Sequence, residues 1–152
     1  MATICDREVD KIEIKVPCKP KYVRTIRRAV ADFAESLNMP ESDVEVIEIA
    51  ASEAVSNIVR HAYSNCKKSG GVRVRCAHRR NGITVEVIDN GCGFNAPPDN
   101  VVPEADFNRE GGFGIILIKI LMDNVNYVSK PDHGTTIKMT KYLKKSVRLR
   151  DL

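Results

Sequence analysis

The chain has 152 residues, enough to bury the core of one domain, and its 43% hydrophobic and 29% charged residues argue against disorder. No apolar run approaches the roughly 18 residues of a membrane span, and charges interrupt the first residues, where a signal peptide needs an apolar stretch. We therefore expect one cytoplasmic domain over residues 1–152, without membrane contact.

The net charge of +4 is concentrated near the end of the sequence. From Lys138 onward six basic residues stand against one acidic residue, a local balance of +5, so the rest of the chain carries −1. A short basic tail of this kind is typical of a solvated or partner-steering end, and we expect no direct nucleic-acid binding. The five cysteines contain no CxxC pair, which favours reduced thiols over a disulfide framework or a zinc site.

The first third of the chain predicts a strand followed by two helices. Residues 11–17, KIEIKVP, alternate apolar and charged side chains, which is typical of a half-buried strand. Apolar residues then recur at helical spacing over residues 21–37. A second helix should begin after Pro40, with Ser42 and Glu45 at the spacing of a capping box, and end near Tyr63.

The rest of the chain predicts two hairpins around a long loop and a short helix. Residues 72–80 and 83–89 alternate on either side of Asn81-Gly82, a strong hairpin signal. Residues 89–114 show no period and form a functional or mobile loop. An apolar helix from Ile115 and strands at 124–130 and 135–143 follow. This order predicts an α+β two-layer sandwich, with the helices packed on one face of a mostly antiparallel mixed sheet.

Glu53 and Asn57 lie one turn apart on the second helix. This helix is apolar on both sides, and such a helix is normally covered on both sides. A buried carboxylate without a partner is costly, so a cation, a ligand or a reacting hydroxyl near Glu53 would account for it. A carboxylate satisfied by local hydrogen bonds is the structural alternative.

Asp89 ends a predicted strand and is followed by Gly91 and Gly93. The carboxylate can point into a cleft while the glycines let a flat ligand approach the backbone. This pattern is also common in plain turns, so it is not specific alone.

Gly112 and Gly114 open the short helix that begins near Ile115. Backbone N–H groups at a glycine-rich helix N-terminus can cradle a phosphate, although the segment could also be a hinge. The order of both glycine segments behind the helix with Glu53 and Asn57 is more specific than either segment alone.

Four successive segments resemble the GHKL ATPases, the Bergerat-fold group that includes gyrase and the histidine kinases. Within that group the chain is most similar to the bacterial anti-sigma factor serine kinases, and the likeness covers nearly its whole length. The four segments are Glu53-x-x-x-Asn57, Asp89-Asn90-Gly91-Cys92-Gly93-Phe94, Gly111-Gly112-Phe113-Gly114 and Gly134-Thr135.

The resemblance implies that the chain binds ATP and Mg²⁺. Asn57 would help to coordinate the Mg²⁺ that bridges the phosphates. Asp89 would accept a hydrogen bond from the adenine amino group, with support from Thr135. Glu53 would orient or deprotonate the attacking serine hydroxyl. The other nucleotide-binding positions are Gly91 and Gly93 beside the base, and Gly112, Phe113 and Gly114 beside the phosphates.

The segment 95–109 would form a lid over the phosphates. Arg109 is its only basic residue and is therefore the candidate catalytic contact of the γ-phosphate. An exposed loop arginine without a role is the alternative.

The resemblance further implies a homodimeric anti-sigma factor that sequesters a sigma factor and phosphorylates an anti-anti-sigma factor of the STAS type. Lys21, Arg24, Arg27 and Arg28 share an arc of the first helix. This arc is either a solvated flank or a docking surface for an acidic partner. We place part of the partner surface there, at Lys21, Arg24 and Arg28.

Three other classes of function are alternatives to an anti-sigma factor kinase. A catalytically inactive switch that binds ATP and partners would need Asn57 and Asp89 but not Glu53. A histidine kinase would need a long dimerisation helix with a phosphoaccepting histidine, which the chain lacks. Three widely spaced histidines offer no ligand cluster for a metal-dependent hydrolase.

Overall fold

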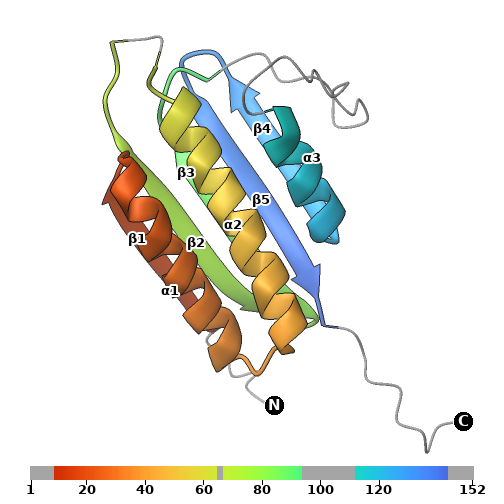
Figure 1. The fold of residues 1–152 in the computed structure, drawn as a ribbon. Coiled ribbons are helices and arrows are strands. Elements are labelled where there is room, and N and C mark those ends of the chain that lie inside the picture. The colour runs from red at the N-terminus through yellow and green to blue at the C-terminus, as the bar shows by residue number, and fades with distance from the viewer. Residues whose placement is uncertain (1–8, 65–66, 94–111, 144–152) are drawn as a thin grey trace, which may run out of the picture.

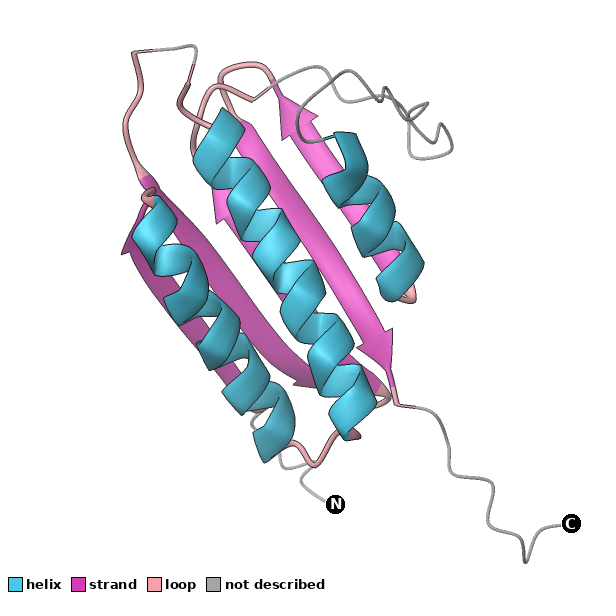
Figure 2. Cartoon of the chain, in the orientation of Figure 1, coloured by secondary structure: helices cyan, strands magenta, loops and turns pink. Residues whose placement is uncertain are grey.

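The computed structural model describes residues 9–64, 67–93 and 112–143. Within these ranges the chain forms one five-stranded sheet with its α-helices on one face, as Figure 1 and Figure 2 show. The predicted α+β two-layer architecture is thereby confirmed. The predicted lid, with Arg109, and the end of the basic tail lie outside the described residues, and the domain bounds of 1–152 stay a prediction.

The sheet has the order β1-β2-β3-β5-β4. All four pairings between the described strands are antiparallel, so this sheet is not mixed. Arg79 pairs with Gly82, which places the hairpin turn at Arg80-Asn81, one residue earlier than the Asn81-Gly82 signal suggests. The strands are β1 (Lys11–Pro17), β2 (Gly71–Arg79), β3 (Gly82–Asp89), β4 (Asn124–Lys130) and β5 (Gly134–Tyr142).

The helices pack side by side, α1 against α2 and α2 against α3, with α2 in the middle of the layer. They are α1 (Val23–Ser36), α2 (Glu41–His61) and α3 (Gly112–Leu121), and a 3₁₀ turn, η1 (Pro20–Tyr22), leads into α1. No helix in the described part of the chain is long and apolar enough to cross a membrane.

The predicted capping box at Ser42 is wrong. The N-cap of α2 is Pro40, which makes no side-chain cap hydrogen bond, and its carbonyl accepts the N–H groups of Asp43 and Val44. Ser42 is already inside the helix, because Pro40 starts α2 two residues earlier. Glu41 and Asp43 place negative charge in the first turn, where the helix dipole favours it.

The hydrophobic core lies between the sheet and the helices. Ile26 and Val30 of α1, and Ile47 and Val55 of α2, are fully or almost fully buried. They pack on the inner positions of the sheet, which are Val72, Val74, Cys76, Ile83, Val85, Val87, Ile137 and Met139. The core therefore fixes α2 across the middle of the sheet.

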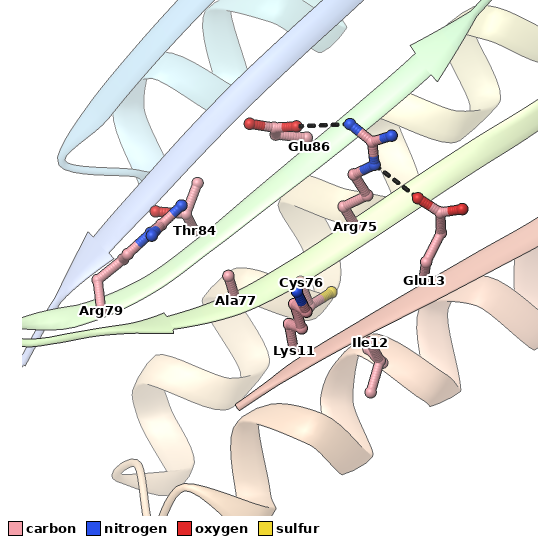
Figure 3. A pocket seen from close by; sticks show the side chains of 9 residues that line it. All are labelled: Lys11, Ile12, Glu13, Arg75, Cys76, Ala77, Arg79, Thr84 and Glu86. Carbon is pink, nitrogen blue, oxygen red and sulfur yellow. Dashed lines mark hydrogen bonds and ion pairs between the residues drawn. The ribbon is translucent and has the colours of Figure 1, made fainter. Parts of the chain in front are cut away.

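The outer face of the sheet is polar. Glu13, Arg75, Glu86 and Lys138 are paired in register on four adjacent strands, with alternating charge. Arg75 Nε lies 2.6 Å from Glu13 Oε2, and Figure 3 shows Arg75 between Glu13 and Glu86 at a surface hollow of about 560 Å³. Exposed ion pairs of this kind contribute little stability each, about 0–1 kcal/mol.

Candidate functional site

The start of α3 lies directly against the polar side chains of α2. A Cβ atom at Gly114 would lie 2.9 Å from Asn57 Nδ2, 3.0 Å from Asn57 Oδ1 and 3.2 Å from Glu53 Oε2. The structure therefore brings Glu53 and Asn57 together at the N-terminal turn of α3. Only glycine leaves the space between these groups open.

Asn57 carries a buried acceptor. Its Oδ1 atom has no hydrogen-bond partner within the part of the chain that the structure describes. An unpaired buried acceptor costs about 1–3 kcal/mol, so a bound ligand that supplies a donor or a cation would recover this free energy. Amide and carboxylate oxygens are ligands that Mg²⁺ accepts, and Mg²⁺ usually takes only one or two of them, with water and phosphate completing its shell. The residues present therefore fit a Mg²⁺-nucleotide complex.

Asp89 carries a second buried acceptor at the end of β3. Its side chain is 3% exposed, and Oδ1 accepts the Gly91 N–H at 2.7 Å. Oδ2 has no hydrogen-bond partner among the described residues. Burial raises the pKa of Asp89, while the backbone N–H groups of Gly91 and Thr135 act in the opposite direction. The free oxygen fits a ligand group that donates a hydrogen bond, such as an amino group.

Thr135 lies next to Asp89. The two residues pair directly across β3 and β5, and both are buried. The sheet register therefore confirms that the segment Gly134-Thr135 lies beside the loop that begins at Asp89, although 46 positions separate the two residues in the sequence.

The glycines after Asp89 have a structural reason of their own. A side chain at Gly91 would collide with the carbonyl of Ala62, and the next residue, Cys92, donates its N–H to that carbonyl at 2.9 Å. Gly93 has a φ of 57° and a side chain there would collide with the Lys130 carbonyl. The loop is thus fastened to the end of α2, and the role of these glycines beside a base stays a prediction.

Gly112 and Phe113 form the first turn of α3. The helix therefore begins three residues before the predicted start near Ile115, and their backbone lies on the same helix N-terminus as Gly114. Gly111 and Arg109 lie outside the described residues.

Tyr63 is a site residue that the sequence did not single out. Its Oη accepts the Asn90 N–H at 3.3 Å and donates to the Gly71 carbonyl at 2.9 Å. The hydroxyl therefore connects the end of α2 to β2 and to the residue after Asp89. An aromatic residue directly after the helix with Glu53 and Asn57 is a weak signal, because the contact depends on sheet topology.

A surface hollow of about 420 Å³ lies beside Glu53. Its lining residues come from α1 and α2 and are Arg27, Glu45, Glu48, Ile49, Ser52 and Glu53. Ile49 is 46% exposed, so the expectation that α2 is covered on both sides is wrong on this side within the described residues. The hollow is open to solvent and gives a second molecule access to Glu53.

The predicted basic arc lies along the same side. Lys21, Arg24 and Arg28 are exposed, and Arg27 forms an ion pair with Glu48 at the hollow. The arc therefore borders the hollow through Arg27.

The expectation of reduced thiols is wrong for Cys92, which is disulfide-bonded. Which cysteines form a disulfide bond depends on which loops the fold brings together. The spacing of cysteines in the sequence does not predict this. Cys18 and Cys76 are free. Burial raises the pKa of Cys76 to about 12, so this thiol is unreactive.

Comparisons with known proteins agree with this geometry. Residues 16–141 match the histidine kinase-like ATPase domain. The chain is 35% identical to the serine-protein kinase RsbW of Bacillus licheniformis, over 90% of this chain and 88% of that protein. It is 36% identical to the serine-protein kinase RsbW of Staphylococcus aureus, over 90% and 89% of the two chains.

Solved structures show the same fold. A crystal structure of the RsbU and RsbW domains of a Mycobacterium tuberculosis protein matches with a TM-score of 0.68 and 22% identity, over 91% of this chain and 34% of that one. The histidine kinase domain of a blue-light activated kinase from Erythrobacter litoralis matches with a TM-score of 0.55 and 21% identity, over 84% and 62% of the two chains.

Proposed function

Because the chain belongs to the histidine kinase-like ATPase domain family and, within it, to the family of the RsbW serine-protein kinases, we propose that it is an ATP-dependent protein serine kinase. The observation that carries this proposal is the meeting of Glu53, Asn57 and Gly114 around an unpaired buried oxygen. A purely structural carboxylate and amide would be satisfied by their neighbours.

The two unpaired acceptors define the two ends of the proposed nucleotide site. At one end Asp89 accepts a hydrogen bond from the adenine amino group, with Thr135 beside it. At the other end Asn57 holds Mg²⁺, and the first turn of α3 offers backbone N–H groups to the phosphates. Bound Mg²⁺-ATP supplies the phosphoryl group and the cation that neutralises its charge.

Glu53 is the proposed base. Its carboxylate lies one turn from Asn57 and at the edge of the open hollow, so a serine hydroxyl that enters from the hollow can reach it. Glu53 accepts the hydroxyl proton while the residues around Asn57 hold the phosphates in line. Phosphoryl transfer depends mainly on such positioning and on charge neutralisation. Arg109, from the predicted lid, remains the candidate for a γ-phosphate contact.

The acceptor is proposed to be a serine of an anti-anti-sigma protein of the STAS type, and the second partner a sigma factor. Lys21, Arg24 and Arg28 are exposed and favour partners with an acidic surface, and Arg27 of the same arc lines the hollow. A homodimer in the cytoplasm completes the proposal, on the strength of the family resemblance.

The presence of Glu53 at the phosphate end favours a kinase over a switch that binds ATP but transfers no phosphoryl group. The experiment that separates them is incubation of the purified protein with Mg²⁺, γ-labelled ATP and candidate anti-anti-sigma proteins. Label on a partner serine supports the kinase. Tight ATP binding without transfer to any candidate supports the switch.

Glu53→Ala tests the base itself. It should keep ATP affinity and lose transfer by about 10²-fold or more, the usual contribution of a general base. Glu41→Ala, at the exposed start of the same helix, is the matched control and should transfer at the wild-type rate. Equal rates for Glu53→Ala and the wild type would make Glu53 a structural residue.

A further inference from the structure

A tyrosine at the end of α2 lies where the pairing of β2 with β3 stops. The two strands pair in register as far as Val72 and Asp89. Gly71 and Asn90 would form the next pair in this register. Instead, the hydroxyl of Tyr63 connects them, because it accepts the Asn90 N–H at 3.3 Å and donates to the Gly71 carbonyl at 2.9 Å. The ladder therefore ends at Asp89, and Tyr63 holds the residue that follows.

Both hydrogen bonds of the Tyr63 hydroxyl have a fixed direction. A backbone N–H can only donate and a carbonyl can only accept, so the phenol gives its one proton to Gly71 and offers a lone pair to Asn90. Burial raises the pKa of Tyr63, while the hydrogen bond from Asn90 lowers it and the charge of Asp89 raises it. The phenol therefore keeps its proton, and with it both contacts, at neutral pH.

Gly70 leaves the space that the ring of Tyr63 occupies. A Cβ atom at Gly70 would lie 2.6 Å from Tyr63 Oη, and 3.0 and 3.1 Å from two carbon atoms of the ring. The three nearest atoms all belong to Tyr63, so a side chain at residue 70 would have to displace the ring. The position of the hydroxyl therefore depends on a glycine in the segment that leads into β2.

The loop after Asp89 is attached to the end of α2 at two points. Tyr63 holds the N–H of the first loop residue, and the Ala62 carbonyl accepts the N–H of Cys92 at 2.9 Å. Between these two points the Gly91 N–H is bonded to Asp89 Oδ1 at 2.7 Å. The peptide that orients the carboxylate is therefore enclosed by the two attachments, and Oδ2 is left without a partner among the described residues.

We infer that Tyr63 is a positioning residue for nucleotide binding: its hydroxyl ends the β2–β3 ladder at Asp89 and thereby fixes the orientation of the Asp89 carboxylate toward the ligand. The inference rests on the proposed nucleotide site, in which Tyr63 has no role of its own. Tyr63 acts on the end of the site that holds the base. Its loss should therefore weaken binding of the base and leave the phosphate contacts around Asn57 unchanged.

Tyr63→Phe removes the hydroxyl alone and tests this role. Calorimetric titration gives the Kd values for Mg²⁺-ADP and for adenosine, which lacks the phosphates. Both Kd values should rise by about three- to ten-fold, the value of one hydrogen bond, and their ratio should stay that of the wild type. A general loosening of α2 would change the ratio, because Asn57 lies on the same helix. Tyr142→Phe is the matched control, since Tyr142 is 46% exposed at the opposite end of β3, and it should change neither Kd.

Gly70→Ala tests the same role without changing the tyrosine. The added methyl group should displace the ring and raise both Kd values. In a Tyr63→Phe protein it should add little, because the hydrogen bond is already lost there. A full additional loss in the double variant would mean that Gly70 does not act through the hydroxyl, and would contradict the inference. Gly70→Ala also serves if Tyr63→Phe does not fold.

Amide hydrogen exchange of the nucleotide-free protein separates this inference from the proposed function. Exchange of the Asn90 N–H should become faster in Tyr63→Phe, whereas exchange of the Cys92 N–H, which is bonded to Ala62, should keep the wild-type rate. Unchanged exchange at Asn90, or unchanged Kd values in a folded Tyr63→Phe protein, overturns the inference alone. A wild-type protein that binds neither ADP nor adenosine would instead remove the proposed function.

Discussion

Both halves of α2 contribute to the hydrophobic core, but only the C-terminal half carries polar side chains of the candidate site. In the N-terminal half, Val44, Ile47 and Ala50 are between 0% and 5% exposed and belong to the hydrophobic core. In the C-terminal half, Glu53 and Asn57 face α3, and a buried oxygen of Asn57 lacks a partner within the described residues. Both halves of the helix therefore contribute stability, and the C-terminal half also holds polar groups that can bind a ligand.

This difference has a consequence for the ligand-free protein. The unpaired oxygens of Asn57 and Asp89 cost about 1–3 kcal/mol each, which is similar to what one fully buried isoleucine contributes. A nucleotide that pairs them binds only the folded state, and it should raise the free energy of unfolding. Substitutions in the two halves should therefore separate stability from binding.

The largest effect is expected from Ile47→Ala, in the N-terminal half of α2. Removing this fully buried side chain should lower the free energy of unfolding by about 2–5 kcal/mol. Ile49→Ala, on the 46% exposed side of the same helix, is the control and should cost less than about 1 kcal/mol. Urea denaturation of both variants measures the difference. Similar losses would mean that the two sides of α2 are equally packed.

Asp89→Asn should raise the free energy of unfolding of the nucleotide-free protein, whereas Ile47→Ala lowers it. It removes an acceptor that the adenine amino group needs, and nucleotide affinity should fall by about 10- to 100-fold or more, the value of a hydrogen bond to a charged group. Without nucleotide the variant should be more stable than the wild type at pH 7, because burial raises the pKa of Asp89 and the variant no longer buries a carboxylate.

The contribution of Asp89 to stability should depend on pH. A raised pKa in the folded state means that stability is full below the unfolded value, near 3.8, and is lost as pH rises through the folded pKa. The advantage of Asp89→Asn should therefore shrink as the pH is lowered from 7 toward 4. A constant advantage across this range would show that the carboxylate is not the cause.

Gly114→Ala should weaken the binding of the ATP phosphates without affecting the binding of the base. The added methyl group would come within 3.2 Å of three polar atoms of Asn57 and Glu53, and relieving such a clash costs about 1–3 kcal/mol. ATP affinity should fall about ten-fold or more, whereas adenosine, which has no phosphates, should bind as it does to the wild type. Equal losses for both ligands would place Gly114 in the general packing of α3.

The smallest effect is expected on the outer face of the sheet. Arg75→Ala breaks the contacts to Glu13 and Glu86, which are exposed to solvent, and should lower the free energy of unfolding only slightly. The loss should become smaller at high salt, where exposed charges are screened. A salt-independent loss of several kcal/mol would mean that this face is covered in solution.

Local patterns predicted the elements of this fold well. The alternation in KIEIKVP gave β1 at the observed bounds, and the Asn81-Gly82 signal gave the right hairpin with its turn one residue early. The predicted start of α2 after Pro40 is confirmed, but the capping box was wrong, because the proline is the N-cap and Ser42 lies inside the helix.

The candidate site was predictable only in part. Glu53, Asn57 and Asp89 are marked by residue type and spacing. Tyr63 acts through a hydroxyl that connects distant segments, and its place directly after the helix is only a weak local signal. The disulfide bond of Cys92 has the same origin, since only the folded chain determines which cysteines meet.

Because the loop after Asp89 is attached to the end of α2, the number of residues between Glu53 and Ala62 is fixed. Cys92 binds the carbonyl of Ala62, which lies nine residues beyond Glu53, and at about 1.5 Å per residue this separates the two points by roughly 13.5 Å along one straight helix. One inserted residue would turn Ala62 by about 100° relative to Glu53 and would move the loop off the helix end. Insertions and deletions of residues are therefore excluded between residues 53 and 62. The surface turn at Arg80-Asn81, by contrast, can accept them.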